Sequence, residues 1–184
     1  LRWRQAPRAD RRQLARVHGF KYISEILASM PKQGRKDADK EAIDKLQTDG
    51  VLVGCDTGYP KETCDAIYGT LEEKHGIRFD VVADSENVRG RPTPFLVYDC
   101  MYKANVYPPA AVIKADDIAA GIQEGANSGA WTVGVCETGA HDSDTLKKAG
   151  AHFTIPGARD LPELIENKIQ PRLARGELPG QSSA

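Results

Sequence analysis

The stretch AVIKADDIAAGIQEGANSGAWTVGV (residues 111–135) decides the fold class of this chain. Residues 111–114 and 131–135 are short apolar runs, and between them Ile118 and Ile122 stand four positions apart. Apolar residues at that spacing predict one face of a helix. Short runs that are apolar almost throughout are typical of strands buried on both faces. The stretch therefore predicts a strand, a helix and a second strand, which is the repeating unit of a parallel α/β sheet.

The same alternation continues on both sides of this stretch. Strands are predicted at residues 51–55, 79–83, 111–114, 131–135 and 151–155. Helices are predicted at residues 40–50, 60–76, 93–104, 118–126, 143–150 and 160–169. Asp160 and Glu163 have the spacing of a capping box at the start of the last helix. The pattern predicts an α/β fold with a three-layer αβα core and a mostly parallel sheet.

The two ends of the chain differ from this core. Residues 1–38 are rich in arginine and show no clear strand, although residues 22–30 have the apolar spacing of a helix. Residues 171–184 contain Pro, Arg, Gly and Ser and are predicted to form a loose tail. We therefore expect a basic lead at 1–38, a core domain at 39–170 and a tail at 171–184.

Composition excludes several classes of function. A formal net charge of -1 over 184 residues argues against general nucleic-acid or membrane-surface binding. The sequence contains no apolar run that approaches the length of a membrane span. Its four cysteines form no CxxC pair, which argues against structural zinc or a disulfide framework and favours a reduced, cytoplasmic protein. The first residue is Leu1, so we expect that the natural start is missing.

Polar residues follow the predicted strands in the segments CDTGY, DSENVRGRPTP and KADD. Ligands of open α/β sheets bind beyond the carboxyl ends of the strands, where these segments would meet. Asp116 and Asp117 are hard oxygen ligands suited to Mg²⁺, and the guanidinium of Arg91 suits a phosphoryl group. Thr57 and Gly58, just before a helix, would form a seat for an anion. These residues predict a site for a phosphoryl group together with Mg²⁺.

Each of these residues also has a plainer interpretation. Asp116 alone could cap the following helix, Arg91 could form a structural ion pair, and Thr57 could be an ordinary turn residue. His141 lies in a segment after a strand, where a solvated loop histidine is the plainer interpretation. It is the joint placement of the set at successive strand ends that favours a ligand site.

The segments GRPTPF (90–95), KADD (114–117) and GIQEGANSGAWTVGV (121–135) resemble the phosphonoacetaldehyde hydrolases of the haloacid dehalogenase (HAD) superfamily. That family carries GRPxPF, then KVDD or KVGD, then GIxEGxNAGxWTVGV. The segment VGCDTGYPKE (53–62) is similar to the family's GSTTGYT segment. The resemblance covers residues 41–164 and implies a HAD-like, Rossmann-type core.

The resemblance also implies a chemistry. The family cleaves the carbon–phosphorus bond of phosphonoacetaldehyde with Mg²⁺, an aspartate nucleophile and a cap-domain lysine that forms a Schiff base. The resemblance further implies a homodimer. By position, Arg91 matches the phosphate-binding arginine and Thr57 the family's hydroxyl residue. Asp117 matches the magnesium aspartate, with Asp116 as its partner. Lys21, in HGFKYISEIL, has a faint similarity to the Schiff-base lysine, although a surface helix lysine is the plainer interpretation.

The sequence departs from the family in three places. No strand ending in the aspartate nucleophile is found before Lys40, so we expect a truncated core without its central strand. The cap is reduced, and the family's Ser-Thr-Thr is replaced by Cys55-Asp56-Thr57. A carboxylate at Asp56 would repel phosphate unless it turns away or contacts a metal. Three interpretations remain: an incomplete copy of an active hydrolase, a non-catalytic HAD-like binding protein, and a HAD phosphatase acting on phosphate esters.

Overall fold

The computed structural model describes residues 15–19 and 33–180. Its strands form a six-stranded sheet in the order β3-β2-β1-β4-β5-β6, and every neighbouring pair is parallel. The strands are β1 Ala15–Gly19, β2 Leu52–Asp56, β3 Val81–Ala83, β4 Val112–Asp116, β5 Trp131–Val135 and β6 Phe153–Ile155. The chain order reverses between β1 and β4, and such a switch point is where α/β sheets bind their ligands.

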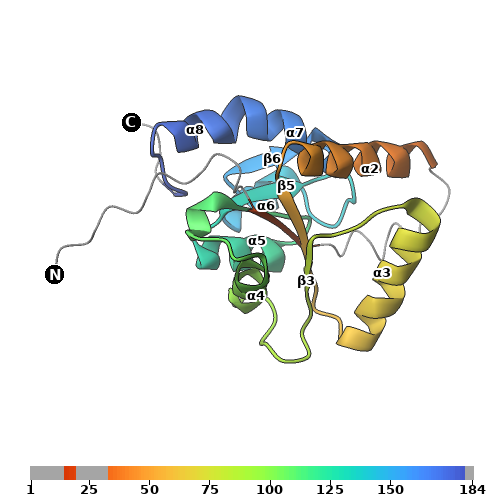
Figure 1. Ribbon diagram of the computed structural model, residues 1–184. Helices are drawn as coiled ribbons and strands as arrows, with labels where there is room; N and C mark the ends of the chain where they lie inside the picture. The colour runs from red at the N-terminus through yellow and green to blue at the C-terminus, as the bar shows by residue number, and fades with distance from the viewer. Residues whose placement is uncertain (1–14, 20–32, 181–184) are drawn as a thin grey trace.

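Helices cover both faces of the sheet. The α-helices are α2 Gln33–Thr48, α3 Lys61–His75, α4 Phe95–Ala104, α5 Ala119–Ser128, α6 Ser143–Lys148, α7 Leu161–Leu164 and α8 Gln170–Ala174. Figure 1 shows α2, α7 and α8 on one side of the sheet and α4 and α5 on the other. Shorter helical turns are η1 Pro109–Ala111, η2 Ala158–Asp160 and the π-helical turn η3 Ile165–Ile169. The predicted three-layer α/β fold is confirmed.

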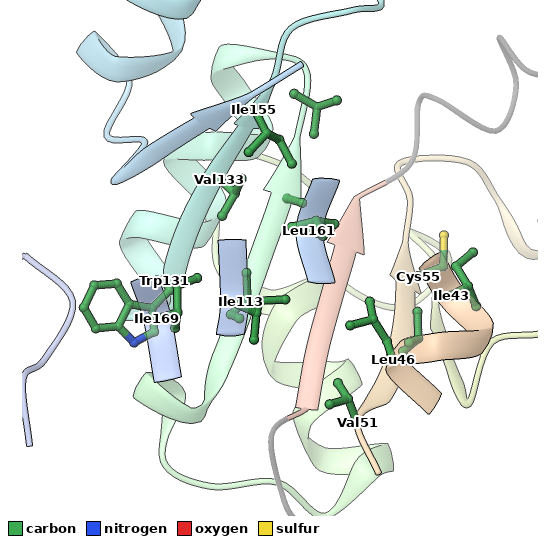
Figure 2. Close-up of a cluster of buried hydrophobic side chains, with 14 of the residues drawn as sticks. Ile43, Leu46, Val51, Cys55, Ile113, Trp131, Val133, Ile155, Leu161 and Ile169 are labelled. Atoms are coloured by element: carbon green, nitrogen blue, oxygen red, sulfur yellow. The ribbon is translucent and has the colours of Figure 1, made fainter. Parts of the chain in front are cut away.

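Each face of the sheet has its own apolar core. Under α2 and the C-terminal helices, Figure 2 shows Ile113, Trp131 and Val133 of the sheet packed with Leu161 and Ile169. The opposite core joins α4 to β3 and β4 through Ala83, Leu96, Val97, Cys100, Met101 and Val112. Burial on both faces explains why the strands read as continuous apolar runs.

The central strand corrects the prediction for the basic lead. Residues 15–19 form β1, which pairs with β2 on one side and with β4 on the other. We expected no strand in residues 1–38 and a sheet without its centre, and both expectations were wrong. Parallel pairing uses backbone N–H and C=O groups, so a short extended segment between two unpaired strand edges is stabilised even without an apolar run.

The C-terminal segment also differs from its prediction. Helix α8 covers Gln170–Ala174, so the first residues of the predicted loose tail are helical. The last helical region begins with η2, earlier than expected, and Asp160 accepts a hydrogen bond from the Gly157 N–H at 2.9 Å. Asp160 is therefore the third residue of η2, where its side chain bonds back to the N-terminal end of the turn, and it is not the N-cap that the sequence predicted.

Candidate active site

Side chains from four segments meet at the carboxyl edge of the sheet. Asp56 ends β2 and Asp116 ends β4, and these strands flank β1. Arg91 comes from the connection between β3 and α4, and Glu124 comes from α5. Lys114 lies two residues before Asp116 on β4, so both project from the same face of the strand.

The centre of the site is a buried ion pair. Lys114 Nζ donates to Asp56 Oδ2 at 2.7 Å and also contacts Oδ1, and both side chains are fully buried. Arg91 Nη2 donates to Asp56 Oδ1 at 2.9 Å and to the Asp56 carbonyl at 3.2 Å. One carboxylate oxygen, Asp56 Oδ1, is therefore shared by two cations.

Two further carboxylates surround the cations. Glu124 Oε2 lies 3.3 Å from Arg91 Nε and 3.1 Å from Lys114 Nζ. Asp116 Oδ2 lies 3.3 Å from Lys114 Nζ and 3.6 Å from Arg91 Nη2, and it makes no hydrogen bond. The structure thus brings Arg91 and Asp116 together on one rim, as the site predicted from the sequence requires.

Burial and charge act against each other on the pKa values of this cluster. Burial favours a neutral Asp56, but the Lys114 ammonium and the Arg91 guanidinium outweigh it and hold the pKa of Asp56 below its usual range. Burial also lowers the pKa of Lys114, and the carboxylates of Asp56, Glu124 and Asp116 together more than reverse that effect. For Glu124 burial wins and raises the pKa to about 7. Asp56 and Lys114 are therefore a charged pair at neutral pH.

Glycines in α5 make room for the buried charges. A Cβ at Gly121 would lie 2.0 Å from Asp116 Oδ2, and a Cβ at Gly125 would lie 2.7 Å from Lys114 Cγ. Both distances are shorter than any real Cβ contact. The GIQEG pattern therefore places the helix backbone directly over β4, with Glu124 reaching into the cluster between the two cations.

Asp116 and Asp117 are the candidate metal ligands. Asp117 is 2% exposed, and both of its carboxylate oxygens are buried without a hydrogen-bond partner. Asp116 Oδ1 accepts from the Ile118 N–H at 3.1 Å, which leaves its Oδ2 without a hydrogen bond. Within residues 15–19 and 33–180 there is no group of three or more His, Cys, Asp or Glu side chains arranged to hold a metal. Mg²⁺ normally takes one or two carboxylates and completes its shell with water and substrate phosphate, and the orphaned oxygens of Asp116 and Asp117 fit that pattern.

Thr57 and Gly58 lie in the turn after β2. The Thr57 N–H donates to the Ala83 carbonyl at 3.0 Å, and the Thr57 hydroxyl accepts from the Tyr59 N–H at 3.2 Å. The Gly58 carbonyl accepts from the Ser85 hydroxyl at 2.8 Å. Thr57 is thus engaged in holding its own turn, and its role as a phosphate ligand stays a prediction.

Two other sequence predictions have different outcomes. Lys21 lies outside the described residues, so its assignment as a Schiff-base lysine stays a prediction. His141 Nδ1 accepts a hydrogen bond from the Ala119 N–H at 2.9 Å, at the start of α5. His141 is therefore a helix cap and not only a solvated loop residue.

Sequence reasoning missed Lys114 and Glu124 as members of the site. The lysine within the apolar run AVIK was the available signal, because a charged residue inside a strand buried on both faces needs a partner. Asp56 was noted only as a departure from the family. Its two cationic partners answer the question it raised: it turns into the sheet edge and is neutralised there.

Comparisons with known proteins place these observations in context. No protein-family model matches the chain. A phosphonoacetaldehyde hydrolase-like protein of Syntrophobacter fumaroxidans is 36% identical over 162 residues, which cover 76% of this chain and 58% of the relative. A phosphonoacetaldehyde hydrolase of Vibrio campbellii is 33% identical over an alignment that covers 83% of this chain and 67% of the relative. The chain thus spans less than two thirds of the length of the first of these relatives.

Solved structures agree with the sequence relatives. The crystal structure of a phosphonoacetaldehyde hydrolase-like protein from Oleispira antarctica matches with a TM-score of 0.69 and 32% identity, over 77% of this chain and 59% of that one. A β-phosphoglucomutase from Clostridium difficile matches with a TM-score of 0.61 at 19% identity, over 84% of this chain and 64% of that one, which shows a shared fold alone. In the described part of the chain, none of the helices is both long and apolar enough to cross a membrane.

Proposed function

Since this chain belongs to the phosphonoacetaldehyde hydrolase family of the HAD superfamily, we propose that it is a Mg²⁺-dependent hydrolase of the carbon–phosphorus bond of phosphonoacetaldehyde. The products would be acetaldehyde and phosphate. The observation that carries the proposal is the meeting of Arg91 with Asp116 at the carboxyl edge of the sheet, 3.6 Å apart, in a chain 33% identical to a phosphonoacetaldehyde hydrolase.

The charge balance of the site supports a role for a divalent cation. Two cations, Arg91 and Lys114, face three buried carboxylates, those of Asp56, Asp116 and Glu124, and the buried carboxylate of Asp117 follows directly in the chain. A dianionic phosphonate would not enter a site with excess negative charge unless a metal ion balanced it. Bound Mg²⁺ would withdraw charge from the phosphoryl oxygens, and Asp117 with Asp116 would hold it.

Arg91 is the group that would orient the phosphoryl oxygens. Its side chain is 12% exposed, so the guanidinium lies at the boundary between the buried cluster and the open rim. Glu124 holds its Nε edge and Asp56 holds Nη2. A guanidinium fixed on these edges keeps its orientation without rearranging when a ligand binds, and this preorganisation is what stabilises developing charge.

The competing candidate is a non-catalytic phosphate-binding protein. It is favoured by one observation: β1 reads ARVHG, so the central strand carries no aspartate that could accept the phosphoryl group. Turnover by this chain would then need a nucleophile from outside β1. The phosphatase alternative, acting on phosphate esters, shares the same rim and differs only in the bond cleaved.

The experiment that separates these candidates measures both products. Purified chain is incubated with phosphonoacetaldehyde, with and without Mg²⁺, and phosphate and acetaldehyde are quantified. The proposal expects equal amounts of both, dependent on Mg²⁺ and lost in Asp117→Asn. Phosphate binding without release of acetaldehyde would support the binding protein. Turnover unchanged in Asp117→Asn would remove the metal assignment.

A further inference from the structure

The buried charge cluster contains a position suited to an oxyanion. Arg91 Nη2 and Lys114 Nζ both point at one oxygen atom, Asp56 Oδ1, with the guanidinium nitrogen 2.9 Å away. Two charged donors that converge on one point would hold a phosphoryl oxygen in the same way as they hold this carboxylate oxygen. Arg91 and Lys114 thus form a position for an oxyanion, here called the oxyanion seat, and the carboxylate of Asp56 occupies it.

Asp56 is held in that seat by hydrogen bonds from both cations. Its side chain is fully buried and both oxygens are hydrogen-bonded, Oδ2 to Lys114 Nζ at 2.7 Å. In contrast, the two other carboxylates that contact these cations, Asp116 and Glu124, each have one oxygen without a hydrogen bond. Asp56 is therefore the carboxylate of this cluster whose two oxygens are both hydrogen-bonded to the cations.

We propose that Asp56 is a built-in anion that occupies the oxyanion seat between Arg91 and Lys114, and that a phosphorus oxyanion binds there only by displacing it. The inference rests on the proposed function in one respect, that the ligand is a phosphate or phosphonate. It adds Lys114 to the anion-binding residues and makes Asp56 the residue that limits affinity.

Replacing Asp56 by a smaller, neutral side chain would empty the seat. In Asp56→Ser the side chain is smaller and neutral, while Lys114 keeps Glu124 Oε2 at 3.1 Å and Asp116 Oδ2 at 3.3 Å as partners. The buried ammonium is thus not left without a counter-charge. Asp56→Asn retains the shape of the carboxyl group and serves as the second variant should Asp56→Ser fail to fold by circular dichroism.

Glu124 offers a matched control. It also places a carboxylate against both Arg91 and Lys114, but it comes from α5. Its Oε2 contacts Arg91 Nε and Lys114 Nζ and makes no hydrogen bond with Arg91 Nη2. Glu124→Gln removes a carboxylate from the cluster without emptying the seat. A comparison of the two variants separates vacancy of the seat from a general loss of negative charge.

The test is titration of each protein with inorganic phosphate by isothermal calorimetry in the presence of Mg²⁺. Recovery of charge-assisted hydrogen bonds by the ligand predicts that Asp56→Ser binds phosphate about tenfold or more tightly than the wild type. Asp56→Asn should bind phosphate about threefold or more tightly than the wild type, and Glu124→Gln should gain less than either Asp56 variant.

Two results would overturn the inference. One is an Asp56→Ser protein, or Asp56→Asn where Asp56→Ser does not fold, that binds phosphate no more tightly than the wild type. The other is an equal gain in Glu124→Gln, which would show that charge alone matters. Binding is measured without turnover, so a gain in affinity without release of acetaldehyde would support the seat while removing the proposed hydrolase. Hydrolysis by the wild type without a gain in phosphate affinity in the Asp56 variants would support the proposed hydrolase and overturn the proposed seat.

Discussion

The close approach of α5 to β4 gives the sharpest test of the site's geometry. Replacing Gly121 by alanine would place a Cβ 2.0 Å from Asp116 Oδ2 and 2.1 Å from its Cγ. Real Cβ atoms essentially never approach another heavy atom below 3.0 Å. Asp116 or the helix must therefore shift by about 1 Å, a movement that a close-packed interior resists.

The cost can be built from its parts. Overpacking of this kind costs about 1–3 kcal/mol, and loss of the 3.1 Å hydrogen bond from the Ile118 N–H to Asp116 Oδ1 adds about 1 kcal/mol. Alanine is the better helix former by about 0.5–1 kcal/mol, which offsets part of this. We expect Gly121→Ala to lower the free energy of unfolding by about 2 kcal/mol and the melting temperature by about 4–8 °C.

Gly69 provides a matched control in the same protein. It also lies in a helix, α3, and a Cβ there would meet nothing within 4 Å. Gly69→Ala should therefore stabilise the protein by about 0.5–1 kcal/mol through helix propensity. Urea unfolding followed by far-ultraviolet circular dichroism measures both variants. A Gly121→Ala protein as stable as Gly69→Ala, at unchanged m-value, would contradict the packing of α5 over Asp116.

Further predictions concern the charges. Lys114→Met should destabilise by about 3–5 kcal/mol, measured by urea unfolding, because Asp56 and Glu124 lose a buried counter-charge; Lys114→Met combined with Asp56→Asn should recover part of that loss. The raised pKa of Glu124, about 7, means that the folded state holds this proton more strongly than the unfolded state. The stabilisation from this group is therefore present at low pH and is lost as pH rises from about 4.5 to about 7. The free energy of unfolding of Glu124→Gln, relative to that of the wild type, should rise across that window when unfolding is measured at a series of fixed pH values. Asp117→Asn should abolish the rise in melting temperature that Mg²⁺ with phosphate gives the wild type, whereas an unchanged shift would place the metal elsewhere. Cys55, whose pKa burial raises to about 12, should stay unmodified by a thiol reagent at pH about 8, while the more exposed Cys136 reacts.

The sequence predicted the sheet well because its strands are buried on both faces. Residues 131–135 were expected as a strand and form β5 with the same bounds. The strand predicted at 111–114 extends to Asp116, because pairing with β5 continues through the Asp116–Gly134 register. Backbone pairing thus carries a strand past the end of its apolar run, and this places Asp116 inside the sheet.

The central strand could not be predicted by the same reasoning. ARVHG has no continuous apolar run, and its position is decided by the edges of β2 and β4. Such an edge effect is a property of the assembled sheet and not of five residues. For the candidate site, sequence order placed Arg91 and Asp116 on one rim. The partners of Asp56 depend on side-chain directions that sequence spacing does not give.

Stability alone does not account for the charges under α5. Buried ion pairs can often be replaced by apolar residues without loss, because desolvation cancels much of their attraction. Here five charged side chains, Asp56, Arg91, Lys114, Asp116 and Glu124, are held together below a helix whose Gly121 and Gly125 lack the side chains that would exclude them. Each glycine also weakens the helix. Helix α5 is thus less stable at the two glycines that make room for the charges. Binding of a ligand to those charges would explain why this arrangement is present.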